Sequence, residues 1–179
     1  METFAEYILA EEDFDNKVEI MYYFKNKRDI FFDPSVAYKA AIVKMFIDCM
    51  KIDVDCNLVV TAMLLCACKK VEVSSDLEKI KRYAKESAEY LETLGFSKRF
   101  CKICEDHNRY SGNLNRERES DILELANQFC GMTVDRPERT SFPIDEAIVL
   151  MEHRNLKDVT NVYLEKFKEF IQVIKEVPA

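Results

Sequence analysis

The chain has 179 residues and a net charge of −7, with 48% hydrophobic and 33% charged residues. This composition is typical of a folded globular domain and not of a disordered chain, and the length suits one domain with a substantial core. The acidic balance provides no global attraction for polyanions, so we expect neither a nucleic-acid partner nor a membrane partner. Only three Gly and four Pro interrupt the chain, which favours long helices and predicts an all-α fold.

The N-terminal segment METFAEYILAEEDFD lacks the basic start and the continuous apolar stretch of a signal peptide. No apolar run approaches the roughly 20 residues that a membrane-spanning helix needs. Both observations predict a cytoplasmic protein.

Helical periodicity appears first in residues 15–32, where apolar and charged side chains alternate in helical fashion. Asp33 and Pro34 then form a helix-start signal, because Asp caps helices and Pro is favoured in the first turn. Further helices are predicted, in chain order, over residues 34–50, 56–69, 76–94, 97–110, 120–134, 143–154 and 158–177. Gly95 is placed to end the fourth of these eight helices as its C-cap.

The predicted helix 56–69 (CNLVVTAMLLCACK) is apolar on nearly every side, so it should lie at the centre of the fold. The last helix directs a stripe of apolar side chains inward: Val162, Phe167, Phe170, Ile174 and Val177. No internal repeat or linker divides the sequence. We therefore expect one helical domain over residues 34–179, with residues 1–33 as an N-terminal helical extension packed on or near it.

Seven cysteines form an odd set in a chain without an export signal, so a disulfide framework is not expected. Cys66 with Cys68, and Cys101 with Cys104, have spacings that a zinc site uses. Both pairs lie in helical patterns, however, whereas structural zinc sites usually take one pair from a tight turn. Buried free thiols are the favoured interpretation, and zinc remains the alternative.

Two adjacent strings carry a family resemblance. Residues 135–147 (DRPERTSFPIDEA) resemble the DRPYR…S-x-x-E-A segment of HD-GYP domains, and residues 122–133 (ILELANQFCGMT) are similar to the ILAVADAFDALT helix of that family. Earlier segments follow in the same order. Residues 63–70 lie where the family has LLHDIGK, residues 83–91 are similar to HPEIGAEIL, and residues 106–112 resemble HHERWDG.

The resemblance implies an HD-domain-like helical bundle. In the HD-GYP family this bundle holds two or three iron- or manganese-type ions that activate a hydroxide, which cleaves cyclic di-GMP. The family's ligand positions fall here on residues that are mostly poor ligands: Tyr38, Cys66, Ala67, Tyr83, Asp106, His107 and Asn127. Ala67 has no ligand atom, and only His107 is still an imidazole. We therefore expect no catalytic residue, no metal and no cofactor, and interpret the chain as a pseudoenzyme.

Three hypotheses for its function follow from this interpretation. The first is a regulatory or protein-interaction module in bacterial signalling, which binds another protein or a second copy of itself through the aromatic N-terminal segment (Met21, Tyr22, Tyr23, Phe24, Phe31 and Phe32). The second is a non-hydrolytic sensor of a cyclic dinucleotide or another phosphate ligand, held by Lys70, Arg109, Arg136 and Arg139. The third is a residual phosphohydrolase, and a thiol nucleophile made of Cys66 or Cys130 with His107 is a variant of it.

Overall fold

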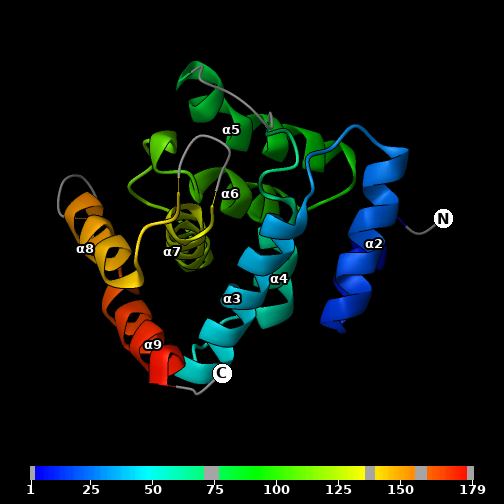
Figure 1. The fold of residues 1–179 in the computed structure, drawn as a ribbon. Helices are drawn as coiled ribbons and strands as arrows, with labels where there is room; N and C mark the ends of the chain where they lie inside the picture. Colours follow the sequence, from blue (N-terminus) through cyan, green and yellow to red (C-terminus); the bar gives the residue numbers. More distant parts are fainter. Residues whose placement is uncertain (1–2, 71–76, 136–139, 156–160, 177–179) are drawn as a thin grey trace.

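A computed structural model describes residues 3–70, 77–135, 140–155 and 161–176 (Figure 1). These residues form α-helices and one short 3₁₀ helix (η1), and none of them is in a strand, which confirms the all-α prediction. The elements in chain order are α1 (Phe4–Ala10), α2 (Phe14–Lys27), α3 (Pro34–Met50), α4 (Cys56–Leu65), α5 (Leu77–Thr93), α6 (Lys98–Asp106), η1 (Arg109–Ser111), α7 (Arg118–Thr133), α8 (Ile144–Asn155) and α9 (Leu164–Glu176). None of the described helices is long and apolar enough to cross a bilayer.

Side-chain oxygens fix where many of these helices begin. The capping residues each accept a hydrogen bond from the backbone N–H three residues later, and they are Thr3, Asp13, Asp33, Asp55 and Ser97. Such caps satisfy N–H groups that have no partner within the helix. The predicted start at Asp33 and Pro34 is therefore confirmed. Gly95 follows α5 with a φ of +93°, which fits its expected role at that helix end.

Four predictions for local structure were wrong. The helix predicted over residues 15–32 ends at Lys27, the last residue of α2. α4 ends at Leu65, and the residues up to Lys69 form turns instead of continuing the helix. The helix predicted over 97–110 ends at Asp106 and gives way to η1. Val162 was expected to face inward but is 66% exposed, because it lies in a turn before α9 begins. Val177, also expected to face inward, lies outside the described residues.

The core forms around α3, which packs against α4, α7 and α9 (Figure 1). An aromatic cluster joins three of these helices: the ring of Phe46 lies 5.0 Å from that of Phe167 and 5.4 Å from that of Phe170, and Phe129 packs on Phe167 at 5.7 Å. As predicted, Phe167 and Phe170 are fully buried. Most of α4 is buried too, in agreement with its apolar sequence.

The N-terminal helices pack on α4 through a buried lysine. The Lys17 ammonium is 1% exposed and donates hydrogen bonds to the Ile8 carbonyl at 2.6 Å and to the Thr61 hydroxyl at 2.7 Å. Asn57 donates to the Leu9 carbonyl at 2.7 Å. Two side chains thus satisfy carbonyls in the last turn of α1, which have no partner within that helix. Residues 3–27 are joined to α4 by polar contacts as well as apolar ones.

Candidate functional site

The side chain of His107, at the end of α6, is the centre of the candidate site. It is 1% exposed, and its Nε2 lies 3.2 Å from the hydroxyl of Tyr83 on α5. The other ring nitrogen, Nδ1, contacts the Cys104 carbonyl. A carbonyl can only accept, so we assign the ring proton to Nδ1, and Nε2 accepts from the Tyr83 hydroxyl. Both nitrogens of His107 are therefore occupied within the protein.

The charge state of His107 follows from its surroundings. Burial lowers its pKa to about 4, and the positive charges of Lys39, Arg116 and Lys70 act in the same direction, against the opposing effect of the Cys104 carbonyl. The ring is therefore neutral at physiological pH. A histidine with this pKa cannot serve as a general acid near pH 7.

A second buried group, the ammonium of Lys39, reaches the same region from α3. Lys39 is 5% exposed and donates to Oδ1 of Asn127 on α7 at 2.9 Å. Its charge also acts on the thiols of Cys66 and Cys130. The family resemblance assigns the neighbouring Tyr38 to a ligand position in this region, but the Tyr38 side chain is 44% exposed. The residue of α3 that reaches into the site is Lys39, which sequence reasoning missed.

The thiols in and near the site are buried and protonated. Burial raises the pKa of Cys66 and of Cys130 to about 12, although Lys39 opposes this shift, and it raises that of Cys68 to about 11. The Cys66 thiol donates to the Met63 carbonyl, with its sulfur 3.6 Å from that oxygen. A nucleophilic cysteine needs a lowered pKa, so these values argue against the thiol-nucleophile variant.

The metal predictions can be compared with the geometry of the described residues. All seven cysteines are free, and five of them are buried, as the favoured interpretation of the thiols expected. No group of three or more His, Cys, Asp or Glu side chains is arranged to hold a metal ion within the described ranges. Ala67, at a position that the resemblance assigns to a ligand, packs against Tyr83 and Ala84. Of the positions that the resemblance assigns to ligands, Ala67 thus makes apolar contacts, His107 makes neutral hydrogen bonds, and Asn127 accepts from the charged Lys39.

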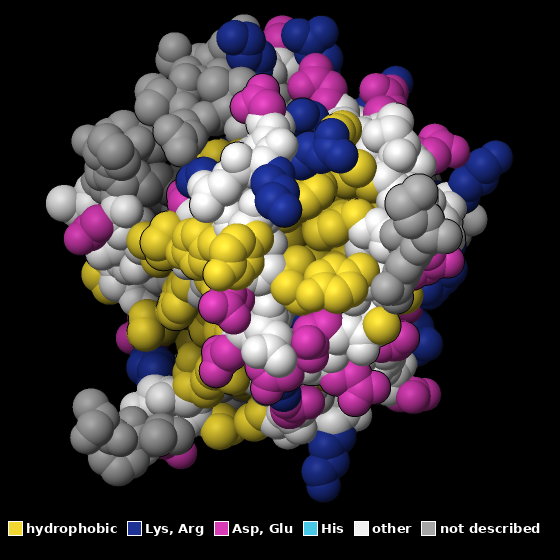
Figure 2. Space-filling view, turned by 90° about the vertical axis from the view of Figure 1, so that its right-hand side faces the viewer, with side chains coloured by type: hydrophobic (Ala, Val, Ile, Leu, Met, Phe, Trp, Pro, Cys, Tyr) yellow, Lys and Arg dark blue, Asp and Glu magenta, His cyan; other side chains and the backbone are white. Residues whose placement is uncertain are grey.

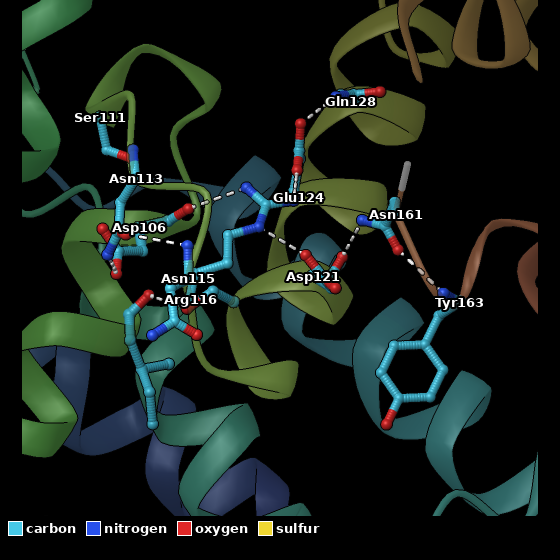
Figure 3. Close-up of polar contacts among 12 residues, drawn as sticks. Asp106, Ser111, Asn113, Asn115, Arg116, Asp121, Glu124, Gln128, Asn161 and Tyr163 are labelled. Carbon is cyan, nitrogen blue, oxygen red and sulfur yellow. Dashed lines mark hydrogen bonds and ion pairs between the residues drawn. The ribbon is translucent and has the colours of Figure 1, made fainter. Parts of the chain in front are cut away.

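Asp106 belongs to a separate polar network at the start of α7 (Figure 3). Its carboxylate accepts a hydrogen bond from Asn113 Nδ2 at 2.8 Å, and its backbone carbonyl accepts one from Arg116 at 3.1 Å. Although the resemblance places Asp106 and His107 side by side as ligands, Asp106 makes these contacts with the loop before α7, whereas His107 contacts Tyr83 and Cys104.

Arg116 is the central residue of this network. Its Nε lies 2.5 Å from Oδ1 of Asp121, and a second guanidinium nitrogen, Nη2, pairs with Glu124. All three side chains are at most 10% exposed. Burial raises the pKa of Asp121 and of Glu124, while the positive charge of Arg116 acts to lower both. The sequence places Arg116 in a polar loop, and nothing in that loop indicates that its guanidinium is buried.

Two of the four cationic residues predicted to bind phosphate, Lys70 and Arg109, are described by the structure. Lys70 lies with its ammonium 5.6 Å from the centre of the Phe31 ring, and its charge acts on His107. Arg109 is exposed and donates to the Tyr110 hydroxyl at 2.9 Å. The other two, Arg136 and Arg139, lie outside the described residues. Of the two members of this set that the structure describes, Lys70 is the one whose charge acts on His107.

Comparison with known proteins found no match to the chain among family models, curated proteins or solved structures.

Proposed function

We propose that the chain is a catalytically inactive HD-GYP-like domain that acts in the cytoplasm as a regulatory or protein-interaction module of bacterial signalling. The observation that carries this proposal is the buried Lys39 ammonium beside Asn127, Cys66 and Cys130. A divalent ion roughly 5 Å from an ammonium would be repelled by about 7 kcal/mol at an effective dielectric constant of about 20. Such repulsion opposes the binding of a catalytic metal.

The other groups of the site support the same proposal. A metal could bind His107 only after one of its hydrogen bonds, to Tyr83 or to the Cys104 carbonyl, had been broken. The amide oxygen of Asn127 already accepts from Lys39. Binding of an ion would therefore require these internal hydrogen bonds to be exchanged, in addition to overcoming the repulsion.

Metal analysis with a matched variant tests this argument. The native chain and Lys39→Met are purified from cells supplied with manganese and iron, and their metal content and cyclic di-GMP hydrolysis are measured. We expect the native chain to carry far less than one ion per molecule and to show no turnover. Lys39→Met removes the repulsion while retaining most of the side-chain volume. One ion per native chain together with turnover would establish the residual phosphohydrolase instead and would overturn the proposal.

The interaction role directs attention to the N-terminal aromatic residues. Met21 and Phe32 are fully buried and therefore belong to the core, whereas Tyr22 and Tyr23 are 41% and 64% exposed. Chemical cross-linking in the native host, followed by mass spectrometry, tests whether cross-links to one partner start near these tyrosines. Serine at both positions should abolish them, and unchanged cross-links would refute a role for this segment.

A phosphate sensor is the second candidate, because three cations act on the His107 region: Lys39, Lys70 and Arg116. Calorimetry with cyclic di-GMP tests this function directly. Binding that is lost in Lys70→Gln would favour the sensor over the interaction module. The absence of heat with cyclic di-GMP and with other nucleotides would remove this candidate.

A further inference from the structure

The outward face of α3 is mostly apolar, with Ser35, Lys44 and Asp48 as its polar residues. Its exposed and half-exposed residues include Pro34, Ala37, Tyr38, Ala41, Met45 and Cys49. Tyr38 and Met45 are 44% and 46% exposed. The opposite face of α3 is already buried against the core, so this helix is apolar on both sides. A helix of that kind is usually covered on both sides. Figure 2, where α2 faces the viewer, shows hydrophobic side chains gathered in the centre and on the left of the molecule, and the left is the side on which α3 lies.

The charges on this face cancel. Its outward-facing ionic residues are Lys44 and Asp48, which form an ion pair at 2.5 Å one turn apart. The face therefore carries none of the net charge of −7. This face therefore does not attract a strongly basic partner or a strongly acidic partner electrostatically. A second copy of this chain would repel the first least when the two approach through this neutral face.

The order of residues on this face also suits packing of α3 against α3 of a second copy. Ala41 lies near the middle of α3 (Pro34–Met50) and near the middle of its outward arc. A small residue there allows two helices to approach at the short end of the usual range, about 8 Å between axes. In an antiparallel pair centred on Ala41, Tyr38 of one copy lies opposite Lys44 of the other, and Met45 lies opposite Ala37. An ammonium over a tyrosine ring is a favourable contact.

We infer that the chain forms a two-fold symmetric homodimer in which α3 packs antiparallel against α3 of the second copy, with Ala41 at the axis. Such an interface is isologous, because every contact occurs twice. It covers the exposed apolar side chains of α3 and places the Lys44 ammonium of each copy near the Tyr38 ring of the other. This inference does not depend on the proposed function.

Solution mass provides the first test. Light scattering should give a concentration-dependent mass that reaches twice the 21.0 kDa of the chain. Ala41→Arg places two charges at the axis, and we expect the dissociation constant to rise at least about 10-fold. Val149→Arg, at a 62% exposed helical position on α8, is the matched control and should leave the dimer unchanged. Circular dichroism and the melting temperature establish that both variants are folded. A monomer at all concentrations, or equal effects of both variants, overturns the inference.

Disulfide trapping tests the geometry independently. In an antiparallel pair centred on Ala41, cysteines at position 41 meet across the axis, within the Cα separation that a disulfide spans. The native exposed thiol of Cys49 is eight residues away, and at about 1.5 Å per residue the two copies of Cys49 stand roughly 24 Å apart along the helices. Mild oxidation should therefore cross-link Ala41→Cys in a Cys49→Ser background and leave the native chain uncross-linked. A cross-link through Cys49 alone would contradict this geometry.

Discussion

Replacing Arg116 by Met should destabilise the fold strongly, because it leaves two carboxylates buried without their cation. Asp121 and Glu124 are at most 10% exposed, and both pair with the Arg116 guanidinium. Removing one partner of a buried ion pair typically costs about 3–5 kcal/mol of the free energy of unfolding. For a chain of this size that loss corresponds to a drop of roughly 6–20 °C in melting temperature. Urea titration followed by circular dichroism measures the loss directly.

The cost should also depend on pH in a defined direction. Burial already raises the pKa of Asp121 and of Glu124, and losing Arg116 removes the charge that opposes this shift. A carboxyl group whose folded pKa lies above its unfolded pKa binds more protons when folded, so stability falls as pH rises through the folded pKa. The stability deficit of Arg116→Met should therefore shrink as pH is lowered from about 7 toward 5.

A surface pair provides the control for this experiment. Lys81 pairs with Glu78 at 3.2 Å, and the two side chains are 39% and 67% exposed. Exposed ion pairs contribute about 0–1 kcal/mol, so Lys81→Met should lose far less stability than Arg116→Met. Adding Glu124→Gln to Arg116→Met should recover part of the loss, because a neutral amide tolerates burial better than a carboxylate. Equal losses in Lys81→Met and Arg116→Met, with no dependence on pH, would refute the reasoning.

Three further predictions concern a buried amine, two glycines and one thiol. Burial lowers the pKa of Lys17 from 10.5 to about 8, so the folded state binds fewer protons than the unfolded state between these values. The free energy of unfolding of the native chain should therefore rise with pH across that range. Lys17→Met should not show this rise, and urea titration at each pH measures it. Gly95→Ala should lower the melting temperature more than Gly112→Ala. Both positions have positive φ, which costs a non-glycine residue about 1–2 kcal/mol, but a Cβ at Gly95 would also meet another side chain at 3.3 Å, whereas one at Gly112 meets nothing within 4 Å. Titration of the folded protein with a thiol reagent should modify Cys49 first, since it is the exposed cysteine, and fast modification of several thiols would contradict the structure.

Much of the fold could be predicted from local signals. Capping residues and apolar periodicity located α3, α5, α7 and α8 to within a few residues, because both signals act within one or two helical turns. The end of α4 was missed because the apolar stretch continues through Cys66 and Cys68, and composition alone does not separate a buried turn from a buried helix. The N-terminal α1 was not predicted, since seven residues are too few to show periodicity.

The candidate site was harder to predict, because its contacts join residues far apart in the sequence. Lys39 and Asn127 are separated by 88 positions, and nothing near either residue indicates the contact. The family resemblance assigned Tyr38 to this region, whereas the buried residue of α3 is its neighbour Lys39. A shift of one residue on a helix turns the side chain by about 100°, enough to move it from the core to the surface. The burial of Arg116 depended on tertiary structure in the same way.

The buried contacts of Lys17 bear on where the folding unit of this chain starts. The sequence favours a boundary near residue 33, yet Lys17 and Asn57 join α1 and α2 to α4, and Ile8, Met21 and Phe32 are fully buried. A protein shortened to start at Pro34 would expose apolar surface on α4 and leave the Thr61 hydroxyl without its donor. Amide protons in α2 should accordingly exchange with solvent through the same cooperative unfolding event as those in α4. The structure thus joins α1 and α2 to α4 in one packed unit.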